Sequence, residues 1–157
     1  MSMHMTTARD DHREYVTVEV GGQLFGLAID RIHDVFAPVN MTPVPLAPRE
    51  IAGILNLRGR IVTAIDLRVR LGLPDREDAG RKMAVGIDVN SESFGLIVDK
   101  VGEVMRLPLS GVESVPANLD RPWSALTAGI YRLERRLLVI LNIDRVLRLS
   151  NETSAAA

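Results

Sequence analysis

The sequence contains an internal repeat, and a repeated chain is expected to fold into two similar units. The segment Phe25–Phe36 matches Phe94–Met105 at five of twelve positions, and four more positions carry conservative replacements. A second, weaker match pairs Ala52–Leu67 with Ala128–Ile143 in the same order along the chain. Two matches in one order indicate a duplicated body rather than a chance similarity between aliphatic segments.

The repeated body lies between two polar ends. We predict a flexible N-terminal lead over residues 1–13, a single domain over residues 14–149 and a flexible tail over residues 150–157. Within the domain, Gly72–Gly80 combines two glycines, a proline and four charged residues, which is typical of a connecting loop. We therefore expect two interlocked subdomains, at about 14–75 and 80–149, with exchange of strands between them allowed.

Most local patterns predict strands. Tyr15–Val20 alternates and is rich in β-branched residues, and the Gly21-Gly22 pair after it signals a hairpin. Other apolar runs are too short for core helices; they lie at 60–65, 82–89, 93–98 and 136–141. Asp66 and Asn142 each precede a short segment with helical spacing. The patterns predict a mainly β fold of two small barrels with about five strands each, packed together, with short helices that include a C-terminal one.

Composition argues against catalysis and against cofactors. The chain has no cysteine, which removes disulfides, thiolate chemistry and cysteine-ligated metals, and fits a reducing compartment. Two of the three histidines, His4 and His12, fall in the predicted lead, so His33 cannot build a metal cage or a catalytic triad alone. Neither phosphate-binding glycine motif occurs. The aliphatic run Leu137–Leu141 is far shorter than the roughly 20 residues of a membrane span, so we expect no membrane insertion.

Because catalysis is disfavoured, the expected function is binding to another macromolecule, either a protein or a nucleic acid. Arg58, Arg60, Arg68 and Arg70 form a basic cluster, which is either a binding patch for acidic groups or a solvated face balanced by nearby acids. A small barrel that binds single-stranded nucleic acid would use aromatic side chains for stacking, but aromatic residues make up 4% of the chain. A net charge of −1 also argues against a phosphate-binding surface. Phe25 and Phe94 are expected in the core, and Trp123 either covers the core, which we favour, or serves as an exposed anchor.

Four blocks of the sequence resemble the CheW-like chemotaxis coupling proteins. The first is the turn Asn56-Leu57-Arg58-Gly59, which leads into an aliphatic strand and Asp66-Leu67-Arg68. The other matching blocks are Phe25–Ile32, Gly95–Val104 and Val139–Leu147, so the resemblance covers about Glu14 to Leu149. It implies two five-stranded barrels like those of src-homology-3 domains. It also implies a cytoplasmic adaptor, without catalysis, at membrane-associated receptor arrays. Its partners would be chemoreceptor tips and the regulatory domain of a histidine kinase.

The resemblance further implies which residues bind the receptor or the kinase. These are Ile32, Asp34, Gly53, Asn56, Leu57, Arg58 and Gly59. Arg58 stands where the family places an arginine important for coupling, and Asp34 stands where many members have a glutamate thought to pair with it. The shorter aspartate reaches less far toward Arg58. Glycine at positions 53 and 59 has two equally good explanations. The backbone conformation there could require Gly53 and Gly59, or the two residues could contact a partner.

Overall fold

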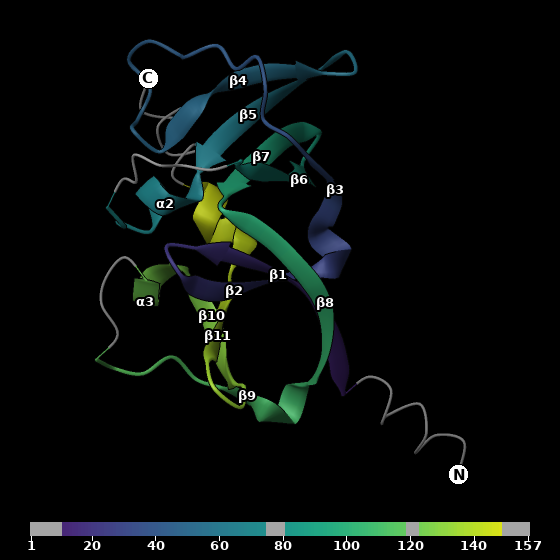
Figure 1. Cartoon of the computed structure of the whole chain (residues 1–157), viewed down its shortest axis with the longest axis vertical. Coiled ribbons are helices and arrows are strands. Elements are labelled where there is room, and N and C mark those ends of the chain that lie inside the picture. Colours follow the sequence, from purple (N-terminus) through teal and green to yellow (C-terminus); the bar gives the residue numbers. More distant parts are fainter. Residues whose placement is uncertain (1–10, 75–80, 119–122, 149–157) are drawn as a thin grey trace.

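The computed structural model describes residues 11–74, 81–118 and 123–148, which form two sheets and a few short helices (Figure 1). Sheet A has the strand order β8-β1-β2-β11-β10-β9, and sheet B has the order β3-β6-β7-β5-β4. The strands of sheet A are β1 (His12–Val20), β2 (Gln23–Ala28), β8 (Lys100–Pro108), β9 (Val112–Glu113), β10 (Thr127–Arg132) and β11 (Leu137–Leu141). Those of sheet B are β3 (Ile32–Phe36), β4 (Ile51–Leu57), β5 (Arg60–Asp66), β6 (Met83–Val89) and β7 (Glu92–Val98).

The helices are short. Two 3-10 turns, η1 (Ile29–Arg31) and η2 (Leu109–Gly111), accompany the α-helices α2 (Leu67–Arg70) and α3 (Trp123–Leu126), and residues 143–148 are also helical. The predicted mainly β fold with a C-terminal helix is thus confirmed. That each sheet closes as in src-homology-3 barrels stays a prediction. No helix in the ranges 11–74, 81–118 and 123–148 has the length and hydrophobicity of a membrane span.

The N-terminal boundary differs from the expectation. β1 begins at His12, so His12 and Arg13 belong to a strand rather than to the predicted lead. Both residues pair with β8, opposite Pro108 and Leu107. Pairing with β8 therefore starts the ordered body before residue 14, where the apolar pattern of the sequence begins. Residues 1–10, the tail from 149 and the centre of the predicted connecting loop, 75–80, lie outside the described residues.

Neither sheet is built from one half of the chain. The N-terminal hairpin β1–β2 lies in sheet A beside β8, β9, β10 and β11, whereas β3, β4 and β5 join the hairpin β6–β7 in sheet B (Figure 1). In sheet A the halves meet at two places, where β2 and β11 run parallel and where β1 and β8 run antiparallel. In sheet B they meet where β5 and β7 run parallel and where β3 and β6 run antiparallel. Each sheet therefore combines a hairpin of one half with strands of the other half.

The two sheets also repeat the same register. Phe25 lies opposite Val139 across β2 and β11, and its equivalent Phe94 lies opposite Thr63 across β7 and β5. Irregularities recur in equivalent strand pairs, between Val16 and Val18 where β1 pairs with β8 and between Ile32 and Asp34 where β3 pairs with β6. They recur also between Ile51 and Gly53 in β4 and between Thr127 and Gly129 in β10. The repeat in the sequence is thus a repeat in strand pairing.

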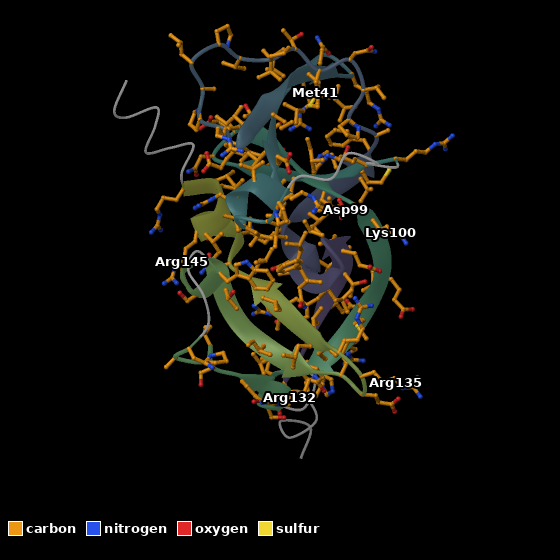
Figure 2. All side chains as sticks on the ribbon, turned by 60° about the vertical axis from the view of Figure 1, so that its left-hand side comes forward. Met41, Asp99, Lys100, Arg132, Arg135 and Arg145 are labelled. Carbon is orange, nitrogen blue, oxygen red and sulfur yellow. The ribbon has the colours of Figure 1, made fainter. Side chains whose placement is uncertain are left out.

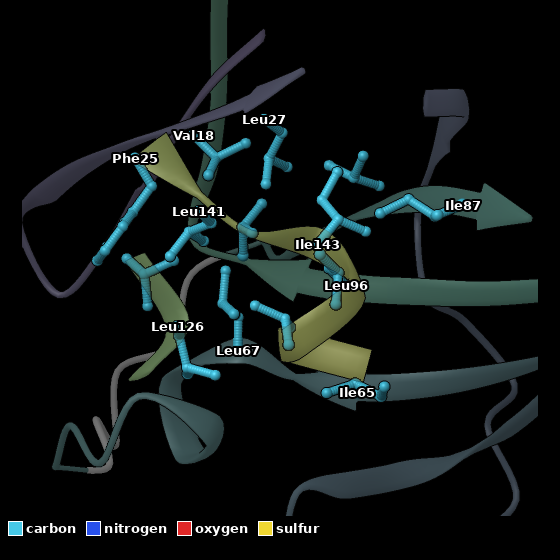
Figure 3. Close-up of a cluster of buried hydrophobic side chains, with 14 of the residues drawn as sticks. Val18, Phe25, Leu27, Ile65, Leu67, Ile87, Leu96, Leu126, Leu141 and Ile143 are labelled. Carbon is cyan, nitrogen blue, oxygen red and sulfur yellow. The ribbon is translucent and has the colours of Figure 1, made fainter. Parts of the chain in front are cut away.

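The main hydrophobic core draws on both sheets (Figure 3). Phe25 and Phe94 are 0% and 4% exposed in it, as predicted. Trp123 packs against this core with its ring centroid 5.3 Å from that of Phe25, and its Nε1 donates a hydrogen bond to the carbonyl of Leu71 at 3.0 Å. Trp123 therefore covers the core, and its polar group is satisfied. A smaller cluster of Leu55, Val62, Ala64 and Ile97 lines the other face of sheet B.

The two predicted helical segments are present, and the side chain before each of them caps its first turn. Asp66 Oδ1 accepts hydrogen bonds from the backbone N–H groups of Arg68 at 3.0 Å and of Val69 at 3.4 Å. At the equivalent position in the second half, Asn142 Oδ1 accepts from the N–H of Arg145 at 3.1 Å. Both side chains satisfy donors that a first helical turn leaves without partners. These caps turn the chain sharply after β5 and β11 and so return it onto the core.

Candidate functional site

Four of the predicted site residues form the tight hairpin between β4 and β5. Leu57 pairs with Arg60 across the hairpin, and the two residues between them, Arg58 and Gly59, have φ values of +54° and +85°. Two consecutive residues with positive φ are the signature of a type I′ turn, which suits the twist of antiparallel strands. Asn56 Oδ1 accepts a hydrogen bond from the N–H of Gly59 at 2.8 Å. Asn56 and Gly59 therefore hold the shape of the turn.

The hairpin presents the side chain of Arg58 to the outside. Arg58 is exposed, and it makes no hydrogen bond or ion pair with any residue that the structure describes. A left-handed conformation is costly for a residue with a Cβ, by roughly 1 kcal/mol. An unpaired guanidinium keeps all its donors for a carboxylate or an aromatic face of another molecule. Arg58 is thus exposed at the tip of a tight turn, with its guanidinium unused by the residues that the structure describes.

Asp34 and Ile32 come from β3, the edge strand of sheet B. Ile32 is partly buried and packs against the main core. The Asp34 side chain is 30% exposed and lies over Gly86 of β6, where the Cβ of any other residue would be. Within the described residues, Asp34 and Arg58 form no ion pair, and Asp34 instead has the imidazole of His33 at 3.5 Å. The aspartate is thus not joined to Arg58 across the hairpin.

Gly53 has a structural reason of its own. A Cβ at this position of β4 would lie 2.7 Å from the carbonyl oxygen of Thr42. The backbone of Thr42 comes this close because it exchanges two hydrogen bonds with Ile54, at 2.8 and 2.9 Å. Gly53 is also buried. Its backbone geometry is therefore sufficient to explain the glycine.

The sequence analysis singled out Arg60 but missed its partners beside the hairpin, Asp88 and Ser93. Arg60 of β5 donates hydrogen bonds to Asp88 of β6, at 2.8 Å, and to the hydroxyl of Ser93 of β7. The Ser93 hydroxyl in turn donates to Asp88 at 3.0 Å. The hydrogen bond from Arg60 is the main reason that the pKa of Asp88 lies below its ordinary value. These groups and His33, Asp34 and Leu57 line one shallow pocket at this end of sheet B.

The predicted basic cluster does not form a single patch. Arg68 is 5% exposed and pairs with Asp99, so it is neither a binding group nor part of a solvated face. Arg70 donates to the backbone carbonyls of Arg145 and Val146, and Arg60 is engaged with Asp88. These three side chains are held by strands and turns of the same molecule. Among the four arginines, Arg58 is the one left for an external partner.

Exposed apolar side chains accompany the hairpin, and the repeat places similar ones in sheet A. Ile61, next to Arg60, is 61% exposed, and Val35 of β3 is 42% exposed. Their equivalents in the second half, Leu137 and Val104, are 41% and 48% exposed. The β4–β5 hairpin and the β10–β11 hairpin lie at opposite ends of the molecule (Figure 1), and Arg132 and Arg135 mark the β10–β11 end (Figure 2). The molecule thus has two related surfaces that face away from each other.

Known proteins share both the sequence pattern and the fold. The model of the CheW-like domain family matches residues 14–151. The chain is 28% identical over 144 residues to chemotaxis protein CheW of Rhizobium meliloti, covering 92% of each protein. It is 28% identical over 151 residues to chemotaxis protein CheW of Bacillus subtilis, covering 96% of this chain and 97% of that protein. The crystal structure of scaffolding protein TtCheW from Thermoanaerobacter tengcongensis superposes with a TM-score of 0.75 at 30% identity, covering 83% of this chain and 84% of that one.

Proposed function

Because the chain belongs to the CheW-like domain family, we propose that it acts as a chemotaxis coupling adaptor by joining a chemoreceptor tip to the regulatory domain of a CheA-type histidine kinase. In this proposal the chain works in the cytoplasm, at membrane-associated receptor arrays, by binding and not by catalysis. The alternative of a small barrel that binds nucleic acid is not favoured, since CheW proteins match the chain over nearly its whole length.

One observation carries the proposal most directly. Arg58 is held outward by a rigid two-residue turn and is unpaired within the described residues, although the strain of its backbone needs a compensating benefit. The adjacent Ile61 exposes 61% of its surface, so it offers an apolar contact beside Arg58. An arginine beside an aliphatic anchor is a common composition of protein interfaces. We infer that this hairpin contacts the receptor or the kinase.

The pair of related surfaces supports a bridging role. An adaptor must contact two partners at once, and the β4–β5 and β10–β11 hairpins lie at opposite ends of the molecule. Ile61 of β5 and Leu137 of β11 are equivalent exposed apolar residues beside these hairpins. Several weak contacts within one assembly strengthen each other through effective concentration. A receptor then changes kinase activity only if its signal alters these contacts differently in the active and inactive states of the kinase.

The proposal is tested by calorimetric titration of this protein with the isolated regulatory domain of a chemotaxis kinase from the same organism. We expect micromolar or tighter binding, and Ile61→Asp should weaken it by about tenfold or more, as expected for a buried interface anchor. Leu46→Asp, which changes a fully exposed aliphatic residue in the loop before β4, serves as the matched control and should bind like the unmodified protein. Absence of binding to any such kinase domain would contradict the proposal.

A further inference from the structure

A cavity of about 570 Å³ lies at the end of sheet B where β5 ends and β6 begins. Its apolar lining comes from Met41 in the loop after β3 (labelled in Figure 2), Ala52 of β4, Met83 of β6 and Ile97 of β7. Three of these residues, Met41, Ala52 and Ile97, also belong to the smaller cluster on this face of the sheet. Small-molecule sites have volumes of about 300 to about 1,000 Å³. The cavity is therefore large enough to hold a small organic molecule.

The loop after β3 forms one wall of the cavity, and the backbone fastens this loop to the sheet. Thr42 exchanges two hydrogen bonds with Ile54 of β4, at 2.8 and 2.9 Å. Val39, in the same loop, lines the cavity and exposes 62% of its surface. Met41 and Met83 have unbranched side chains, which adapt their shape to an apolar group. The cavity thus combines a fixed backbone with an adaptable apolar lining.

The charged groups of the lining are mainly cationic. Arg81 and Lys82, directly before β6, line the cavity together with Asp66 at the end of β5. Asp66 Oδ1 already accepts two hydrogen bonds from the backbone of α2. Lys82 is partly buried, and neither Arg81 nor Lys82 makes a hydrogen bond or an ion pair with a described residue. A partly buried ammonium group gains most from contact with an anion, so the lining favours a ligand with a carboxylate.

We propose that this cavity binds a small amphipathic carboxylate of the medium-chain fatty acid type. The alkyl chain packs between Met41 and Met83, and the carboxylate binds the ammonium group of Lys82. The cavity lies at the Asp66 end of β5, whereas the hairpin lies at the Arg60 end, about 20 Å away along the strand. The proposed ligand site is therefore separate from the hairpin surface and does not rest on the adaptor function.

The test is titration of this protein with sodium octanoate and, separately, with uncharged 1-octanol, followed by NMR of the methionine methyl groups. Octanoate should shift the signals of Met41 and Met83 in a saturable manner, with a Kd of about 1 mM or tighter. Lys82→Gln should weaken octanoate binding about fivefold, as expected for a partly exposed ion pair, and leave 1-octanol binding unchanged. Lys100→Gln replaces the other lysine of the chain and should bind both ligands like the unmodified protein. Thermal melts establish that both variants are folded.

Three outcomes would overturn the inference. If octanoate shifts neither methionine signal, the cavity does not take a ligand of this type. If Lys82→Gln and Lys100→Gln bind octanoate equally well, Lys82 does not bind the carboxylate. If the two signals change with protein concentration and not with octanoate, a second copy of the chain covers the cavity instead. None of these results bears on kinase binding, so failure of this inference is distinguishable from failure of the adaptor proposal.

Discussion

Arg68 of α2 and Asp99 at the junction of β7 and β8 form an ion pair between the two halves of the chain, with a nitrogen–oxygen distance of 2.5 Å. The Arg68 side chain is 6% exposed and also donates to the carbonyl of Pro74. Asp99 accepts a second hydrogen bond, at 2.8 Å, from the N–H of Gly21 in the β1–β2 turn. In the second half, the equivalent of Arg68 is Asp144, which pairs with Arg31 at 2.8 Å. Because the repeat matches Asp99 with Asp30, the residue before Arg31, the two ion pairs lie at neighbouring rather than equivalent positions of the repeat.

Removal of Arg68 should destabilise the fold more than removal of its exposed counterpart. We expect Arg68→Met to lower the free energy of unfolding by about 3 kcal/mol, because it leaves Asp99 with a poorly compensated charge. Arg31→Met removes the pair whose side chains are 32% and 60% exposed, and it should cost less than about 1 kcal/mol. Urea denaturation of both variants gives the comparison. Equal losses would show that burial does not distinguish the two pairs.

Replacement of Gly53 tests whether that residue is needed by the backbone. A Cβ at Gly53 would lie 2.7 Å from the Thr42 carbonyl oxygen, so Gly53→Ala should destabilise the protein by about 2 kcal/mol or more. Gly59→Ala is the control, since no atom lies within 4 Å of its Cβ position and it incurs only the cost of positive φ, about 1 kcal/mol. The melting temperatures of the two variants show which replacement destabilises the protein more. A Gly53→Ala variant that melts like the unmodified protein but fails to bind would make Gly53 a contact residue.

The Asp88 carboxyl should contribute to stability in a defined range of pH. Its pKa is lower than the ordinary value of 3.8 in the folded protein, mainly because Arg60 donates a hydrogen bond to it. The unfolded state therefore binds the proton more readily, and the stabilisation is present above about pH 4 and is lost as the pH falls below that value. Arg60→Gln should raise the pKa of Asp88, as followed by NMR of its carboxyl carbon. An unchanged titration would exclude Arg60 as the cause.

Because Arg58 is exposed, replacing it tests partner binding separately from the stability of the fold. Arg58→Glu should weaken assembly with the receptor and the kinase but leave the thermal melt nearly unchanged, because Arg58 has no partner among the described residues. Lys100→Glu makes the same change of charge on β8 and controls for the altered net charge. Co-sedimentation of the ternary complex and calorimetry of the protein alone are the two measurements. A melt lowered by several degrees would instead identify Arg58 as a structural residue.

Local features of the fold could be predicted because neighbouring residues determine them. The caps at Asp66 and Asn142, the hairpin at Gly21-Gly22 and the burial of Phe25 and Phe94 each follow from a short segment of sequence. The distribution of strands between the sheets could not be derived in this way. Because the halves are similar, a strand pattern is equally compatible with a partner from its own half and with one from the other half.

The candidate site was predictable only in part, for the same reason. The resemblance to a family identified the hairpin residues around Arg58, which are consecutive in the sequence. The contacts of Arg60 with Asp88 and Ser93 join strands that are distant along the chain, and so does the pair of Arg68 with Asp99. A charged residue in a short amphipathic segment is normally expected on the surface. The burial of Arg68 becomes evident only when its partner is placed beside it.

The strand exchange gives the fold the architecture of a domain-swapped homodimer whose two chains have been joined end to end. Two copies of a half-length chain could form the same pair of sheets, each copy lending its first hairpin to the other. The covalent link makes that association intramolecular and independent of protein concentration. Since the two halves contribute to one core, neither is a separate folding unit, and damage to one should unfold both.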